Sequence, residues 1–104
     1  MIDIPIPATA TTGTAIPFPG GWGTLYMAGT FDSATYTLQF SPDNGTTWFT
    51  VVDTVGSNIA LTAAGYKNFV LAGPGQLRLS RASGTSPSGM IAKIGNGQTS
   101  IREY

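Results

Sequence analysis

The fold is decided by residues 35–52, which read TYTLQFSPDNGTTWFTVV. Apolar side chains alternate with Thr and Gln in the first half, so that Tyr36, Leu38 and Phe40 share one face of an extended chain. The Pro-Asp-Asn-Gly sequence in the middle is typical of a turn, and the second half is rich in aromatic and β-branched residues. The stretch therefore predicts two antiparallel strands joined by a turn at residues 43–45.

The rest of the chain from residue 22 onward repeats this pattern. Short strand-like stretches recur about every ten residues between Gly, Pro, Asn and Asp, and no stretch shows helical periodicity. About eight short strands predict an all-β fold, an antiparallel β-sandwich or jelly roll, with a closed eight-stranded barrel as the alternative. A second hairpin is predicted at Asn96 and Gly97, which lead into a last strand at residues 99–102.

Residues 1–21 differ from the β-domain that we predict over residues 22–104. They contain four prolines, which lack the amide donor and exclude a helix or a central strand. We interpret them as an extended arm that becomes ordered across a neighbouring subunit, so that the domain folds without it; a frayed tail is the alternative. The interpretation depends on apolar side chains that a solvated linker would not need, namely Ile2, Ile4, Ile6, Ile16 and Phe18.

The composition excludes several classes of function. The 104-residue chain carries five acidic and five basic residues and has neither Cys nor His. A neutral surface gives no electrostatic attraction to nucleic acid or acidic membranes, and no apolar run is long enough to span a bilayer. Without the commonest general base and metal ligands, we expect no enzyme, no catalytic residue, no cofactor and no metal site. The lack of disulfides favours synthesis in a reducing cytoplasm.

One motif has a defined spacing. Ser41, Asp43, Gly45 and Trp48 resemble the Asp-box, Ser-x-Asp-x-Gly-x-x-Trp. In this spacing the carboxylate accepts backbone amides across the turn, the glycine adopts positive φ, and the tryptophan packs over the hairpin. The box recurs in sialidase-like propellers, where it is structural. A single copy in so short a chain implies the hairpin alone.

The aromatic side chains are expected mostly in the core. Trp22 lies between glycines where the arm meets the domain, and it is the aromatic residue that we most expect to be exposed. Arg78, Arg81 and Lys93 are interpreted as a solvated face or, alternatively, as a sheet face that contacts an acidic partner. The candidate partner-binding residues are therefore Trp22, Arg78, Arg81 and Lys93.

Residues 31–94 contain four features in order: the box at residues 41–48, LTAAG at residues 61–65, GPGQLRL at residues 73–79 and the Ser/Gly/Thr-rich loop that follows. In this pattern the stretch resembles small bacteriophage virion structural proteins. The resemblance implies a capsid decoration (cement) protein or a head or tail appendage. Such a protein would be made in the bacterial host cytoplasm, would form a homotrimer, and would bind the major capsid protein at the virion surface.

A second class of function remains open. A β-sandwich of this kind is also expected in a carbohydrate- or host-receptor-binding module of a phage tail fibre or of a secreted glycan-active protein. A glycan-binding module should expose two or three aromatic side chains on one face and should have no apolar arm that binds a neighbouring subunit. Because residues 1–21 are expected to form such an arm, the sequence favours a structural protein that assembles with other subunits.

Overall fold

The computed structural model describes residues 2–7, 12–84 and 87–96 of the chain. Among these residues all regular structure is β-strand, and there is accordingly no helix that could cross a membrane. The strands are β1 (Ile2–Asp3), β2 (Ile16–Phe18), β3 (Gly21–Thr30), β4 (Thr35–Ser41), β5 (Phe49–Thr50), β6 (Ala60–Leu61), β7 (Gly65–Leu71), β8 (Gly75–Ala82) and β9 (Ser88–Asn96).

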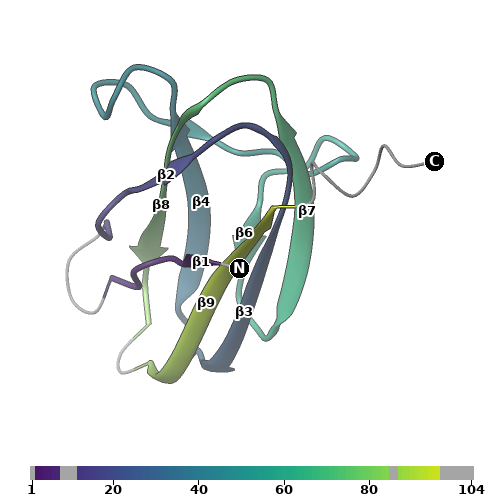
Figure 1. Ribbon diagram of the computed structural model, residues 1–104. Coiled ribbons are helices and arrows are strands. Elements are labelled where there is room, and N and C mark those ends of the chain that lie inside the picture. The colour runs from purple at the N-terminus through teal and green to yellow at the C-terminus, as the bar shows by residue number, and fades with distance from the viewer. Residues whose placement is uncertain (1, 8–11, 85–86, 97–104) are drawn as a thin grey trace.

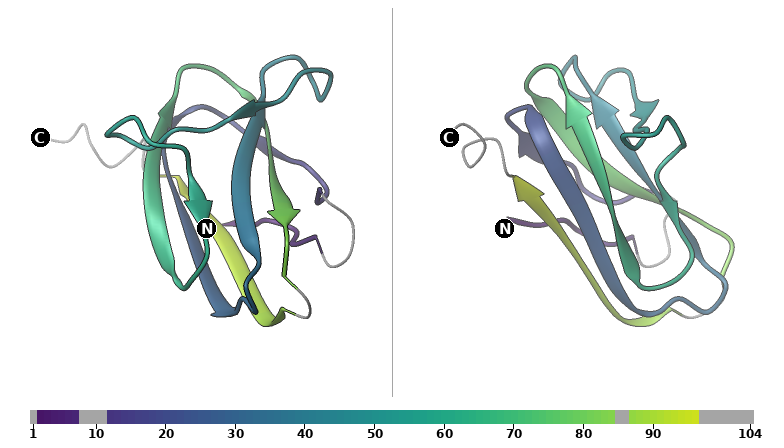
Figure 2. Two further views of the ribbon diagram at one scale, coloured as in Figure 1. Left: turned by 180° about the vertical axis from the view of Figure 1, so that it is seen from behind. Right: turned by 90° about the vertical axis from the view of Figure 1, so that its right-hand side faces the viewer.

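The strands form two sheets that lie against each other (Figures 1 and 2). The four-stranded sheet has the order β1-β9-β3-β7, and the five-stranded sheet has the order β2-β8-β4-β5 with β6 also paired to β4. Every strand pair is antiparallel. The prediction of an all-β fold with antiparallel sheets is confirmed. No described strand belongs to both sheets, so these residues do not form the closed barrel.

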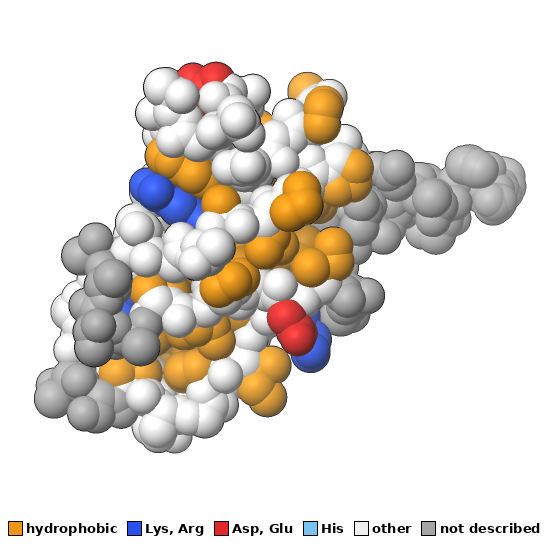
Figure 3. All heavy atoms as spheres, turned by 60° about the vertical axis from the view of Figure 1, so that its left-hand side comes forward, with side chains coloured by type: hydrophobic (Ala, Val, Ile, Leu, Met, Phe, Trp, Pro, Cys, Tyr) orange, Lys and Arg blue, Asp and Glu red, His pale blue; other side chains and the backbone are white. Residues whose placement is uncertain are grey.

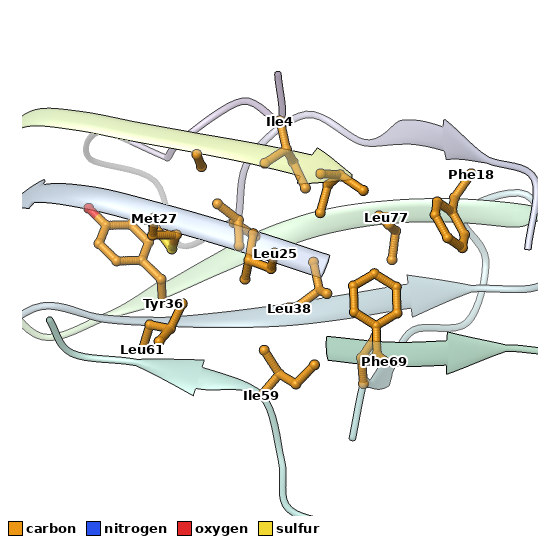
Figure 4. Packing of buried hydrophobic residues seen from close by; sticks show 14 of the residues in the cluster. Ile4, Phe18, Leu25, Met27, Tyr36, Leu38, Ile59, Leu61, Phe69 and Leu77 are labelled. Atoms are coloured by element: carbon orange, nitrogen blue, oxygen red, sulfur yellow. The ribbon is translucent and has the colours of Figure 1, made fainter. Parts of the chain in front are cut away.

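The core lies between the two sheets and follows from the alternation in the sequence. In β4, Tyr36 and Leu38 are buried, whereas the Thr and Gln side chains between them stay partly exposed. In β8, Leu77 and Leu79 are buried in the same way. Figure 4 shows Leu38 and Leu77 near Leu25 of β3, and Tyr36 beside Met27 of the same strand. Period-two alternation therefore places one apolar row of each strand in the core.

The N-terminal segment packs on its own domain, and this differs from the expected arm. We call residues 2–7 and 12–20 the N-terminal strap. The strap pairs with the four-stranded sheet through β1 and with the five-stranded sheet through β2, so that it closes the side of the sandwich between β9 and β8 (Figure 1). Ile4 and Phe18 are each 2% exposed and belong to the core. The interpretation as an arm over a neighbouring subunit is therefore wrong for these two side chains.

Hydrogen bonds hold the strap along its course. The Ile4 amide donates to the Ala92 carbonyl at 3.2 Å, and the Gly13 amide donates to the Leu79 carbonyl at 2.8 Å. The Phe18 ring lies 5.6 Å from the Phe69 ring, between their centroids. Prolines are tolerated in edge strands, because one side of an edge strand needs no amide donor. The same prolines that exclude a central strand thus allow the strap to protect two sheet edges.

The opposite edge of the four-stranded sheet is β7, which pairs with β3 alone among the described strands. Lys67 lies opposite Leu25 in the register, so it occupies a position on the inward face. An inward-pointing charge on an edge strand opposes pairing with a further strand, because that pairing would bury the ammonium group. The predicted turn at Gly97 and the strand at residues 99–102 lie outside the described residues.

Candidate binding face

The Asp-box residues build the β4–β5 turn. The Ser41 side chain is fully buried; its hydroxyl donates to Asp43 Oδ1 at 2.9 Å and accepts the Gly45 amide at 2.7 Å. Asp43 Oδ1 also accepts the Thr47 amide at 2.8 Å, and Gly45 has a φ of 93°. Hydrogen bonds from Thr47, then from Ser41, hold the pKa of Asp43 below its ordinary value. These bonds stay inside the turn, so the residues of the box act in folding.

The turn is tied to the outer face of the five-stranded sheet. Trp48 Nε1 donates to the Gly45 carbonyl at 3.2 Å, and the Arg78 guanidinium lies 4.0 Å above the Trp48 ring centroid. Arg78 Nε also donates to Gln39 Oε1 at 2.7 Å. Arg78 is therefore occupied by a cation–π contact and a hydrogen bond within its own sheet.

The three basic side chains do not line one face, and this part of the sequence interpretation is wrong. Arg78 and Lys93 lie on different sheets. Arg81 is three residues beyond Arg78 on β8 and lies opposite the buried Tyr36, so it occupies the other face of that strand. Its guanidinium donates to backbone carbonyls of residues 83 and 84. Because Arg78 and Arg81 are an odd number of residues apart on one strand, their side chains point to opposite faces of the sheet.

The outer face of the four-stranded sheet is apolar, in contrast to the outer face of the five-stranded sheet. The outward positions of β4 and β8 carry Thr, Gln, Arg and Ser side chains. The outward positions of β3, β7 and β9 instead include five large apolar side chains that are at least 38% exposed. These residues, which we call the aromatic face, are Trp22 at 47%, Tyr26 at 38%, Tyr66 at 61%, Val70 at 50% and Ile91 at 53%.

The aromatic face is organised in rows across β3 and β7. Trp22 lies opposite Val70, and Tyr26 lies opposite Tyr66 with ring centroids 5.7 Å apart. Between these rows Thr24 lies opposite Asn68, and the Thr24 hydroxyl donates to Asn68 Oδ1 at 2.8 Å. Two apolar rows therefore flank one polar row.

Charge on this side of the molecule is compensated. Lys93 is the one charged outward residue of β3, β7 and β9 in the described part of the chain, and its ammonium lies 2.5 Å from Asp3 of β1. The Lys93 hydrogen bond, and then its charge, lower the pKa of Asp3, so the Asp3 carboxyl group is ionised at neutral pH. Figure 3 brings forward the adjoining side of the molecule, with β1 and β2, where hydrophobic side chains also gather and few side chains are charged.

Two shallow hollows adjoin the aromatic face. One has a volume of about 330 Å³ and is lined by Tyr26, Tyr66, Ile91 and Lys93 among others. The second, of about 400 Å³, lies on the strap side of Ile91 and is lined in part by Ile4 and Ile6. Both are open depressions in the surface, of the size that holds a small ligand group.

The sequence interpretation named one residue of the aromatic face and missed the others. Trp22 was the aromatic expected to be exposed, and it is. Tyr26 was expected in the core, and Tyr66, Val70 and Ile91 were not singled out. Alternation does not reveal them, because β3 and β9 carry apolar residues on both faces.

The carboxylates do not gather into a metal site. No group of three His, Cys, Asp or Glu side chains comes together within residues 2–7, 12–84 and 87–96. Asp53, like Asp43, caps a turn: its Oδ1 accepts the Val55 and Ser57 amides at 3.0 Å each.

Searches of protein-family models, curated proteins and solved structures find no match for this chain. Its function is therefore inferred from its own residues.

Proposed function

We propose that this chain is a non-catalytic carbohydrate-binding β-sandwich module and that the aromatic face is its binding surface. The observation that carries the proposal is the exposure of Trp22, Tyr26 and Tyr66 on one face while the strap packs on its own domain. Exposed aromatics and the lack of an apolar arm that binds a neighbouring subunit are the two features expected of a glycan-binding module. The host-receptor-binding module of a tail fibre belongs to the same proposal.

The contrast between the two outer faces supports this role. A β-sandwich in water normally presents polar side chains outward on both sheets. Here β4 and β8 of the five-stranded sheet follow that rule, and β3, β7 and β9 of the four-stranded sheet do not. An exposed apolar patch bordered by polar residues marks an interaction site, because its solvation costs free energy that a ligand recovers on binding.

The absence of catalysis is also part of the proposal. Three of the described carboxylates serve turns or a surface ion pair: Asp43 and Asp53 accept backbone amides, and Asp3 binds Lys93. None of these three carboxylates belongs to the outward rows of β3 and β7, where the aromatic side chains lie.

Binding of the purified protein to a panel of glycans tests the proposal. Trp22→Ala and Tyr66→Ala are expected to weaken binding of any glycan that the parent retains. Phe49→Ala is the matched control, because Phe49 is an aromatic residue of similar exposure, 56%, on the other sheet. If the parent binds no glycan, or if Phe49→Ala weakens binding as much as Trp22→Ala, the proposal fails.

Capsid decoration is the second candidate, and a separate apolar surface favours it. Val52 and Val55 are exposed in the segment that follows β5, with Val55 at 84%. Two apolar surfaces on a nearly uncharged domain are what a subunit with several neighbours needs. In this proposal the chain forms a homotrimer on the major capsid protein at the virion surface, with the expected jelly-roll connectivity, after synthesis in the host cytoplasm.

Co-sedimentation with capsids tests the second candidate. Val55→Lys is expected to abolish particle binding without changing the fold, because the side chain is at an exposed turn held by Asp53. Light scattering of the free protein measures the expected trimer. Undiminished particle binding by the Val55→Lys variant would remove the observation that favours decoration.

A further inference from the structure

We infer that the ligand of the aromatic face is a neutral, extended oligosaccharide that lies along β3 and contacts two aromatic stations at once. The inference rests on the proposed carbohydrate-binding function and names its ligand class. The first station is Trp22 with Val70 beside it, and the second is Tyr26 with Tyr66 beside it. Each station is a cross-strand pair on the outer face of the four-stranded sheet.

The spacing of the stations requires a ligand of several units. Trp22 and Tyr26 are four residues apart on β3, which corresponds to about 13 Å along an extended strand. A single sugar ring is shorter than this distance, so the two stations contact different units of one chain. The ring faces of Trp and Tyr suit sugars whose hydroxyls are equatorial, because such sugars present a flat apolar face of C–H groups.

The polar row between the stations supplies hydrogen bonds to the middle of the ligand. The Thr24 hydroxyl donates to Asn68 Oδ1, which leaves both amide hydrogens of Asn68 and the lone pairs of the Thr24 oxygen for other partners. Sugar hydroxyls both donate and accept. Along β3 and β7 an apolar pair is followed by a polar pair and then by a second apolar pair. This order matches an oligosaccharide whose end units stack on the two stations and whose middle unit forms hydrogen bonds.

The electrostatics select a neutral ligand. Lys93 stands opposite Asp3 in the strand register and forms a surface ion pair with it, so the two residues together add no net charge. An acidic glycan would meet the Asp3 carboxylate beside the ammonium group and would gain little. On β3 and β7 themselves, the pairs that contain Trp22, Thr24 and Tyr26 carry no charge, and Lys93 lies beside Tyr26 on β9.

The size of the face argues for an oligosaccharide rather than a second protein. The six residue steps from Trp22 to Ala28 span about 20 Å, and three strands abreast cover about 14 Å, so the face has a projected area of about 280 Å². A stable protein–protein interface needs about 800 Å² from each partner. A second copy docked on this face alone would therefore bury too little surface.

Isothermal titration of the full chain with chosen probes tests the inference. The probes are cellohexaose and chitohexaose as neutral chains, cellobiose as a chain that reaches one station, and hexagalacturonate as an acidic chain. We expect at least one neutral hexaose to bind about tenfold or more tightly than cellobiose, and hexagalacturonate to bind no better than cellobiose. Trp22→Ala and Tyr66→Ala are each expected to reduce hexaose affinity about tenfold, with Phe49→Ala unchanged.

The outcomes separate this inference from the proposed function. If an acidic glycan binds best and Trp22→Ala abolishes that binding, the neutral ligand is wrong and the carbohydrate-binding face stands. If cellobiose binds as tightly as the hexaoses, the two-station geometry is wrong. If no glycan of any class binds, both proposals are overturned. Melting temperatures of the variants confirm that each remains folded, as expected for exposed side chains.

Discussion

Replacing Phe18 with alanine tests whether the N-terminal strap belongs to the folded domain. Phe18 is 2% exposed, and its ring packs 5.6 Å from the ring of Phe69 (Figure 4). The strap strand that carries it, β2, has three residues. If the strap were a free arm, the substitution would leave the stability of the isolated protein unchanged.

The expected loss of stability is large for a domain of this size. Truncation of a fully buried Phe to Ala costs about 3–5 kcal/mol, from lost transfer free energy and the cavity left behind. A 104-residue domain has a free energy of unfolding of about 5–15 kcal/mol. The variant should therefore lose about a fifth of its stability or more, which lowers the melting temperature by at least about 12 °C.

Urea unfolding of the two proteins measures this loss as a shift in midpoint at constant slope. Ile2→Ala is the matched control on the same strap, because Ile2 is 45% exposed and should cost less than about 1.5 kcal/mol. Ile4→Ala, at a position that is 2% exposed, should resemble Phe18→Ala. An unfolding midpoint of Phe18→Ala equal to that of the parent would refute the assignment of the strap to the core.

Four further predictions follow from the structure. Trp48→Ala should cost about 1–3 kcal/mol in thermal unfolding, less than for a buried ring, because Trp48 is partly exposed and stacks on Arg78. Gly75→Ala should lower the melting temperature, because the added Cβ would lie 2.3 Å from a backbone oxygen of β4; an unchanged value would contradict that packing. Lys67→Ile should raise the molar mass measured by light scattering, because it removes the inward charge on the β7 edge. The lowered pKa of Asp43 contributes stability above its unfolded pKa of about 3.9, so the melting temperature should fall as the pH drops below about 4, less steeply in Asp43→Asn.

The local sequence was sufficient to predict β4 and the turn that follows it. The limits of β4 follow from strict alternation and turn residues, and the turn at residues 43–45 follows from Asp43 and Gly45. β5 is shorter than the strand predicted from the second half of residues 35–52, because only Phe49 and Thr50 pair with β4. The length of a strand depends on how far the neighbouring strand continues to pair with it. The position of that neighbouring strand cannot be inferred from the local sequence.

The sequence alone determined the all-β class, because alternating apolar residues and turn chemistry are properties of neighbouring residues. It did not determine where the strap lies. The apolar side chains of the strap favour burial. From the sequence alone, they could be buried equally well against a neighbouring subunit or against the open sheet edges of their own domain. Only the tertiary structure decided between them, since β8 and β9 lie at the same side of the sandwich, where β1 and β2 pair with them. The aromatic face arose in the same way: β3 is apolar on both sides, and packing against β4 and β8 selected Leu25 for the core and left Trp22 and Tyr26 in solvent.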